Sequence, residues 1–176
     1  GELVEQIKYS LNNELVSSDI VGTSAPSIYD SNATIVSGDG KNIVFVNTNA
    51  NGLNNGTSWP NAFTSLEKAL KMASFCQNID EIWVAEGTYL PNSTNARNES
   101  FELPVGMSIF GGFPGTGTPV WEDRNPQAHE TILSGDVGAS GVTTDNTYFV
   151  VYMPVSTDTT LMDGFTITLG HADGTG

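Results

Sequence analysis

After residue 40, short apolar runs alternate with polar stretches rich in Gly, Asn, Ser and Thr. Short apolar runs bounded by turn-forming residues predict β-strands rather than helices. The predicted strands are residues 42–47, 81–85, 107–110, 131–133, 148–153, 160–162 and 165–168, and a further short strand is predicted at 34–36. We therefore expect a chain built mainly of short strands.

One segment has helical spacing instead. Its apolar positions are Leu66, Ala69, Leu70 and Ala73, and Thr64 or Ser65 can cap the first turn. This pattern predicts an α-helix at about residues 65–75. Residues 2–16 also carry a leucine or isoleucine at every fourth position, so the N-terminal segment, residues 1–40, is interpreted as a linker that includes a short helix.

A glycine closes four of the predicted strands, at Gly87, Gly112, Gly135 and Gly164. The steps between them are 25, 23 and 29 residues, which is the range expected for a solenoid whose units are stable only when stacked. A solenoid strand bends sharply into the next face, and a bend with positive φ favours Gly. We therefore predict an all-β solenoid, with the helix covering its open end.

Charge and composition exclude several classes of protein. The 176 residues carry a formal net charge of −14 and only six Lys and Arg, which disfavours binding to nucleic acid or to anionic membrane surfaces. No apolar run is long enough to span a membrane, so no membrane insertion is expected. Cys76 is the one cysteine and cannot form an internal disulfide. Carboxylates leave a role for calcium open.

Several ordered segments resemble the start of pectate-lyase-like right-handed β-helix proteins, above all the large secreted and surface proteins of bacteria. The matching pieces lie between about residues 43 and 172 and include NGTSW at 55–59, EIWVA at 81–85, IFGGF at 109–113, TILSGD at 131–136 and DGFTIT at 163–168. The resemblance implies a right-handed three-sheet parallel β-helix with an N-terminal capping α-helix. It also implies an extracellular or cell-surface location.

On this interpretation residues 41–176 are the cap and first coils of a β-helix whose far end is missing. The apolar strand at 165–169 lacks a following cap, so we expect further coils or a protein partner to cover it. The predicted function is a non-catalytic β-helix module for adhesion, carbohydrate contact or filament structure. The alternative is the N-terminal part of a polysaccharide lyase or glycoside hydrolase whose active coils lie beyond residue 176.

Aromatic residues are the candidates for contact with a polysaccharide or other glycan. Trp83, Trp121 and Tyr89 are the proposed contact residues, and Trp59 is predicted to pack under the cap. Trp83 alternates with Ile82 and Val84 along its strand, so it must point to the opposite face. Core packing is the competing role for these rings.

No catalytic residue and no metal ligand is predicted. Arg124 is interpreted as part of a loop ion pair, and His129 and His171 as surface or turn residues. Asp136 and Asp163 follow strands and would line up if their coils are successive, but Asp is also favoured in turns, which is the role assigned here. The aspartates available to calcium, Asp39, Asp136, Asp145 and Asp173, do not form a dense calcium-loop motif.

Overall fold

The computed structural model describes residues 35–36, 40–76, 78–91 and 96–173, all of which lie in the unit Ala33–Gly176. Short strands in parallel sheets dominate this unit, and one α-helix accompanies them. The helix predicted within residues 2–16 lies outside the described residues.

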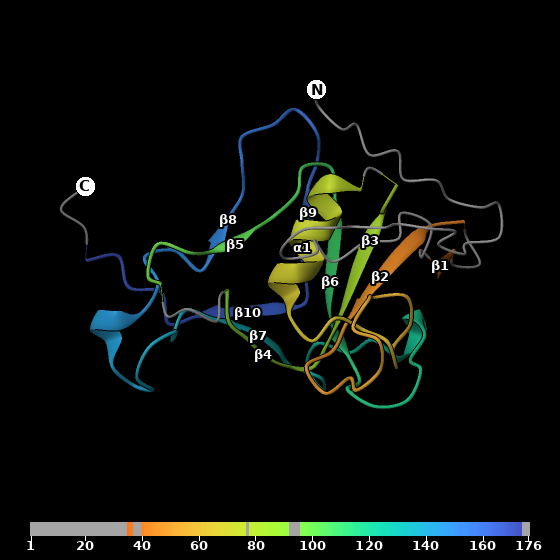
Figure 1. Cartoon of the computed structure of the whole chain (residues 1–176), viewed down its shortest axis with the longest axis horizontal. Helices are drawn as coiled ribbons and strands as arrows, with labels where there is room; N and C mark the ends of the chain where they lie inside the picture. Colours follow the sequence, from red (N-terminus) through yellow and green to blue (C-terminus); the bar gives the residue numbers. More distant parts are fainter. Residues whose placement is uncertain (1–34, 37–39, 77, 92–95, 174–176) are drawn as a thin grey trace, which may run out of the picture. The chain divides into compact units, whose positions relative to one another are not determined.

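The strands form three sheets (Figure 1). The long sheet has the order β1 (Ile35–Val36), β2 (Asn42–Val46), β3 (Glu81–Ala85), β6 (Ser108–Phe113) and β9 (Leu161–Asp163). The second sheet has the order β10 (Phe165–Thr168), β7 (Thr131–Ser134) and β4 (Gly87–Tyr89). The third pairs β5 (Phe101–Glu102) with β8 (Val151–Tyr152). Every pair is parallel except β1 with β2.

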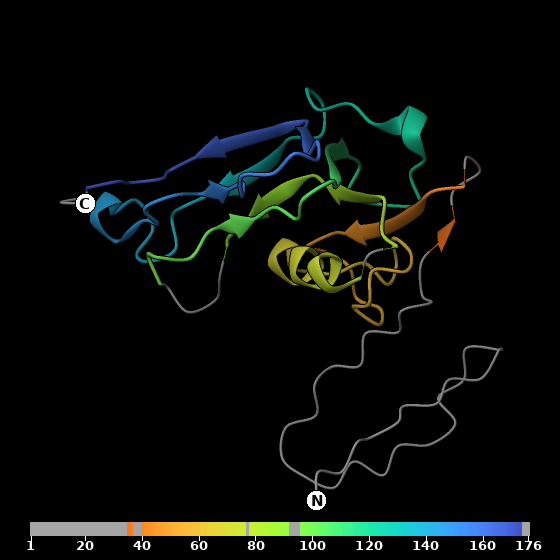
Figure 2. The ribbon, with the colours of Figure 1, turned by 90° about the horizontal axis from the view of Figure 1, so that it is seen from above.

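The chain visits the three sheets repeatedly in one order. It runs from β3 to β4 to β5, then from β6 to β7 to β8, and then from β9 to β10. The strands β3 to β7 therefore each pair with the strand three places later in the chain. We call one such passage through the three sheets a circuit. Figure 2 shows successive circuits displaced in one direction, from β2 (orange) beside the helix to β10 (blue).

The helix α1 spans Leu66–Phe75 and confirms the predicted element to within a residue at its start. The side chain of Ser65 caps it by accepting a hydrogen bond from the backbone N–H of Lys68 at 3.4 Å. Its buried residues are Leu66, Ala69, Leu70, Met72 and Ala73. This apolar stripe packs against β2 and β5.

Most predicted strands agree with the structure to within a residue or two. One predicted strand is too long, and two strands of the structure are missing from the prediction. The strand predicted at 148–153 pairs only at Val151 and Tyr152, because its partner β5 is itself two residues long. Strands β4 and β5 escaped prediction because Gly-Thr-Tyr and Phe-Glu are too short to show a period.

The four marker glycines do not mark four equivalent bends. Gly164 has a φ of +82° at the corner between β9 and β10, and Gly87 has a φ of +141° at the start of β4. Gly112 lies inside β6, at a β-bulge where the register with β3 shifts. Gly135 has no positive φ; a side-chain carbon there would instead collide with the carbonyl of Leu169.

The glycine spacing therefore does not measure the length of a circuit. Gly112 belongs to the long sheet, whereas Gly135 follows β7 of the second sheet within the same circuit. The register of the long sheet shows which residues of neighbouring circuits are equivalent. Ser108 of β6 pairs with Glu81 on one side and with Leu161 on the other. The circuits are much less regular than the sequence suggested.

At β2, β3 and β6 the long sheet is buried on both faces. Its inner face carries Val44, Ile82 and Ile109, which join α1 and residues of the other two sheets in one apolar cluster. Its outer face carries Phe45 and Trp83, which belong to a second cluster. Parallel sheets are usually covered on both sides, and here helix and sheets cover one face while loops cover the other.

Candidate functional site

Strand periodicity and one bulge place the aromatic residues of the outer face. Phe45 pairs with Trp83, and Trp83 pairs with Phe110, so three rings follow one another across the strands. Strict alternation would send Phe113 to the opposite face from Phe110. The extra residue at the Gly112 bulge returns Phe113 to the outer face, where it pairs with Ala85.

Two loops complete what we call the aromatic layer. Its members are Phe45, Trp59, Trp83, Phe110, Phe113 and Trp121. Trp83 stacks on Phe113 with ring centroids 4.7 Å apart and planes 12° apart. Trp121 meets Phe110 edge-on at 4.9 Å and Trp83 at 5.6 Å. Such pairs each contribute ~0.5–1.5 kcal/mol beyond simple burial, so the layer is firmly packed.

The three predicted contact residues have different environments. Trp83 is only 8% exposed, and its indole N–H donates to Oε2 of Glu81 at 2.7 Å. Tyr89 is buried on the inner side, where its hydroxyl donates to the carbonyl of Ala85 at 3.0 Å and burial raises its pKa. Neither ring presents a face to solvent. Trp121, in the short 3-10 helix Trp121–Asp123, is 42% exposed.

Trp59 also departs from its prediction. It packs on the outer face against Phe45 and Phe113, and its indole N–H donates to the carbonyl of Pro119 at 2.8 Å. The helix α1 lies with the inner cluster instead. Trp59 therefore covers the long sheet rather than packing under the cap.

Arg124 lies beside the exposed ring of Trp121. Its guanidinium carbon is 5.3 Å from the Trp121 centroid and 5.4 Å from the Phe110 centroid. Its Nε donates to the carbonyl of Gly111 at 2.7 Å, and Nη2 pairs with Asp163 of β9. Arg124 thus forms an ion pair, as predicted, but the partner is Asp163 of a strand rather than a residue of its own loop. The pair links the loop that carries Trp121 to the last strand of the long sheet.

Asp136 and Asp163 do not line up on neighbouring coils. Asp163 ends β9 of the long sheet and pairs in register with Phe110. Asp136 follows β7 of the second sheet, and its Oδ2 accepts a hydrogen bond from Gly141 at 3.2 Å. The paired-carboxylate geometry considered from sequence therefore does not form.

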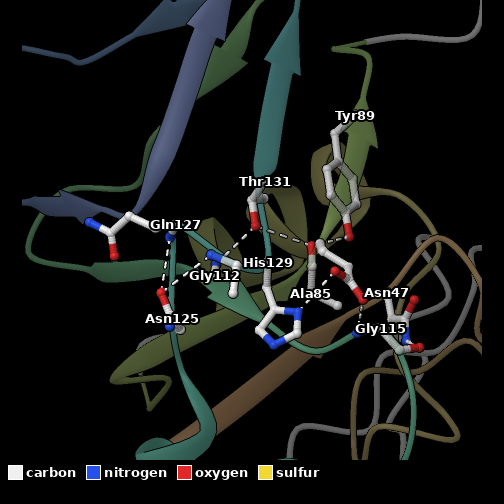
Figure 3. Close-up of polar contacts among 11 residues, drawn as sticks. Asn47, Ala85, Tyr89, Gly112, Gly115, Asn125, Gln127, His129 and Thr131 are labelled. Carbon is white, nitrogen blue, oxygen red and sulfur yellow. Dashed lines mark hydrogen bonds and ion pairs between the residues drawn. The ribbon is translucent and has the colours of Figure 1, made fainter.

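His129 and Glu86 form a polar contact at the turn between β3 and β4, and Figure 3 shows His129 at this turn. Nδ1 of His129 lies 2.9 Å from Oε2 of Glu86, and the backbone N–H of Gly115 donates to Oε1 at 2.8 Å. The His129 contact and then the Gly115 N–H lower the pKa of Glu86. His129 is thus a turn residue, as predicted, and it joins the loop before β7 to this corner.

Buried hydrogen bonds strengthen the same corner. The hydroxyl of Thr131 accepts from the backbone N–H of Gly112 at 2.9 Å and donates to the carbonyl of Ala85 at 3.3 Å. The amide of Asn47 donates to the carbonyl of Gly115 at 3.0 Å. Figure 3 shows these side chains gathered around the turn. Their partners are mainly backbone atoms, which indicates a structural role.

Within residues 35–36, 40–76, 78–91 and 96–173, no group of three or more His, Cys, Asp or Glu side chains could hold a metal ion. Across the same described ranges, no helix has the length and apolar character needed to cross a membrane.

The fold and site together define a parallel-sheet protein whose long sheet carries an aromatic layer with one exposed tryptophan. No family model matches the chain, and no match was found among curated proteins or solved structures. The resemblance to pectate-lyase-like proteins therefore rests on the sequence segments quoted above.

Proposed function

We propose that residues 41–176 form the cap and first coils of a right-handed three-sheet parallel β-helix. The support is the repeated visit to three sheets, in which β3 to β7 each pair in parallel with the strand three places later. Crossover connections between parallel strands of one sheet are almost always right-handed. The helix α1, which packs against β2 and β5 at the first circuit, is assigned the role of cap.

The proposed function is a non-catalytic extracellular or cell-surface module that contacts carbohydrate. The observation that carries it is the half-exposed ring of Trp121, supported from below by Trp83 and Phe110. A sugar ring stacks on a planar aromatic face, and affinity is gained when that face is already fixed before binding. Arg124 and Asp163 at the rim supply hydrogen-bonding groups next to it.

The charge of the chain narrows the class of glycan. A net charge of −14 repels uronate and sulfate groups, so a neutral glycan is the favoured ligand. The cell-surface location itself rests on the resemblance to bacterial surface proteins.

The test is a glycan array, followed by titration of the best neutral oligosaccharide with intrinsic fluorescence as the readout. We expect Trp121→Ala to weaken binding at least about tenfold, because the stacking face is removed. Phe149→Ala is the matched control, since it removes another exposed ring, 67% accessible, away from the aromatic layer. Equal binding by Trp121→Ala and the unaltered chain would contradict the proposed site.

The enzymatic alternative has a separate readout. A lyase or hydrolase would shorten a polysaccharide, and this alternative places the active coils beyond residue 176. The full-length protein, with any sequence that follows residue 176, is therefore incubated with neutral and anionic polymers, with and without calcium, and product length is measured. Cleavage that depends on the protein concentration would replace the non-catalytic proposal.

We further propose that another polypeptide segment, either further coils or a protein partner, covers the last circuit. Among the described strands, β8, β9 and β10 each end their sheet. Nearby apolar side chains, including Leu161, Ile167 and Leu169, are exposed. Unpaired strand edges with apolar neighbours bind further strands. A monodisperse monomer of these 176 residues in light scattering would contradict this part of the proposal.

A further inference from the structure

The connection from β7 to β8 folds back on itself between Asp136 and Thr147, a segment we call the 136–147 loop. The backbone N–H of Thr147 donates to the carbonyl of Gly135 at 2.8 Å, which brings the two ends of the loop together. Within it, Oδ2 of Asp145 accepts from the backbone N–H of Ala139 at 2.8 Å. Oδ2 of Asp136 accepts from the backbone N–H of Gly141.

The same loop holds four buried side-chain oxygens without a hydrogen-bond partner. They are Oδ1 of Asp136, Oδ1 of Asp145, Oδ1 of Asn146 and Oγ1 of Thr147. No other buried side-chain nitrogen or oxygen in the described part of the chain lacks a partner. Buried polar atoms are nearly always satisfied, and an unpaired buried carboxylate oxygen is costly, so four in one short loop point to a missing ligand.

Burial and close packing support this interpretation. Asn146 is 2% exposed and Thr147 is fully buried, so their side-chain oxygens have no access to bulk water. Two glycines leave space for the side chains that carry these oxygens. A side-chain carbon on Gly135 would lie 2.6 Å from Oγ1 of Thr147, and one on Gly138 would collide with the Asp145 carboxylate. The Thr147 hydroxyl thus lies against the residue next to Asp136.

We propose that the 136–147 loop binds one calcium ion through these four oxygens. Two carboxylates, an amide carbonyl and a hydroxyl are hard neutral or anionic donors, and Ca²⁺ accepts such mixed oxygen sets with flexible geometry. Mg²⁺ demands stricter octahedral geometry, and Zn²⁺ favours nitrogen and sulfur donors, which the set does not contain. The backbone N–H groups hold each Oδ2 and so orient each Oδ1.

The bound ion would fix the loop to the last circuit. Nε of Arg97 donates to the carbonyl of Asn146 at 2.8 Å, and the backbone N–H of His171 donates to the carbonyl of Thr147 at 2.8 Å. Asp173, another aspartate considered for calcium, is instead paired with Arg97 at 3.1 Å. Calcium would therefore stabilise the segment that carries β8 and β10, independently of any glycan contact.

The test is isothermal titration of the metal-free 176-residue chain with CaCl₂, together with thermal unfolding in calcium, in magnesium and in EDTA. We expect one saturable site with a Kd on the order of 10⁻⁴–10⁻³ M, as in other calcium sites of extracellular modules. Asp136→Asn and Asp145→Asn should each weaken binding at least about tenfold, because each removes one of only two anionic ligands. Asp158→Asn, an exposed aspartate outside the loop, is the matched control.

Thermal unfolding separates a calcium ligand from a merely structural aspartate. Calcium should raise the midpoint of the unaltered chain and leave those of Asp136→Asn and Asp145→Asn nearly unchanged. In EDTA these variants should unfold at or above the midpoint of the unaltered chain, because an uncompensated buried charge is removed. A midpoint lowered equally with and without calcium would overturn the proposal.

A second measurement needs no variant. Tb³⁺ binds calcium sites, and Tyr148, adjacent to Thr147, can sensitise its luminescence. Emission that Ca²⁺ displaces with the affinity found by calorimetry would support the site. No saturable binding in either experiment would mean that water satisfies the four oxygens, and the proposal would fall.

Discussion

Truncation of Trp83 tests the energetic importance of the aromatic layer. The Trp83 ring stacks on Phe113 at 4.7 Å and contacts Phe45 and Trp121 at 5.9 and 5.6 Å. Its indole N–H also donates to the buried carboxylate of Glu81. Trp83→Ala therefore removes a central ring and a hydrogen-bond donor together.

Replacing a buried Trp by Ala costs ~3–5 kcal/mol through lost transfer energy and the cavity left behind. The lost hydrogen bond leaves Oε2 of Glu81 unpaired, which adds about 1 kcal/mol, the lower end of the ~1–3 kcal/mol range, because Lys41 still pairs with Oε1 of the same carboxylate. The expected loss of unfolding free energy is therefore about 5 kcal/mol. Such a loss is a large fraction of the ~5–15 kcal/mol that stabilises a typical domain.

Urea unfolding followed by far-ultraviolet circular dichroism measures the loss of unfolding free energy. The comparison requires that the dependence of this free energy on urea concentration has the same slope in both proteins. Trp83→Phe keeps a ring but loses the donor and should cost about 1–2 kcal/mol. Trp121→Ala should cost clearly less than Trp83→Ala, because its ring is already partly exposed. If Trp83→Ala costs no more than Trp121→Ala, the aromatic layer does not stabilise the long sheet.

Three further substitutions test local features. Glu86→Gln should remove a pH-dependent contribution to the unfolding free energy, because the contact with His129 lowers the pKa of Glu86 in the folded protein. This contribution is fully present above pH 4.5, the ordinary pKa of a glutamate, and is lost as the pH falls through the lowered pKa. Unfolding midpoints across that pH range should converge for the two proteins, and parallel curves would contradict the linkage. Gly164→Ala should cost at least about 2 kcal/mol, because its φ is +82° and an added carbon would collide with Arg124; an unchanged thermal midpoint would count against this. Ser65→Ala should cost about 1 kcal/mol by removing the N-cap of α1, and an unaltered urea midpoint would contradict it.

Local patterns predicted the elements well. The α1 stripe and the strands at Glu81–Ala85 and Phe165–Thr168 carry their own periodicity, so neighbouring residues suffice to specify them. Strands β4 and β5 are defined only by pairing with distant partners. No local pattern in two or three residues could have revealed them.

The glycines show why register was harder to predict than secondary structure. A sequence shows only that Gly is present, and Gly suits a positive φ, a bulge or a close approach equally. Gly164 serves a corner, Gly112 a bulge and Gly135 the close approach of Leu169. Which use applies depends on the neighbouring circuit, so spacing between glycines could not give the length of a circuit.

Two of the three aromatic candidates, Trp83 and Tyr89, are buried, and the burial of Trp83 was hard to predict for a related reason. Alternation correctly placed Trp83 on the opposite face from Ile82 and Val84. That the opposite face is covered follows from Trp59 and Trp121, which lie in loops without periodicity. Sequence thus predicted the direction of the Trp83 side chain but not its burial.

The candidate sites lie in the long connections rather than in the strands. A single residue, Glu86 or Gly164, joins the first strand to the second in two circuits, whereas the circuit of β6 inserts residues 114–130 before β7. That insertion carries Trp121, and the connection after β7 carries the 136–147 loop. Inserted loops on a rigid sheet can vary without disturbing the stacked strands, which is why binding residues concentrate there. If both proposals hold, the circuit of β6 supplies both the glycan contact and the calcium site, while the shorter circuits supply the frame.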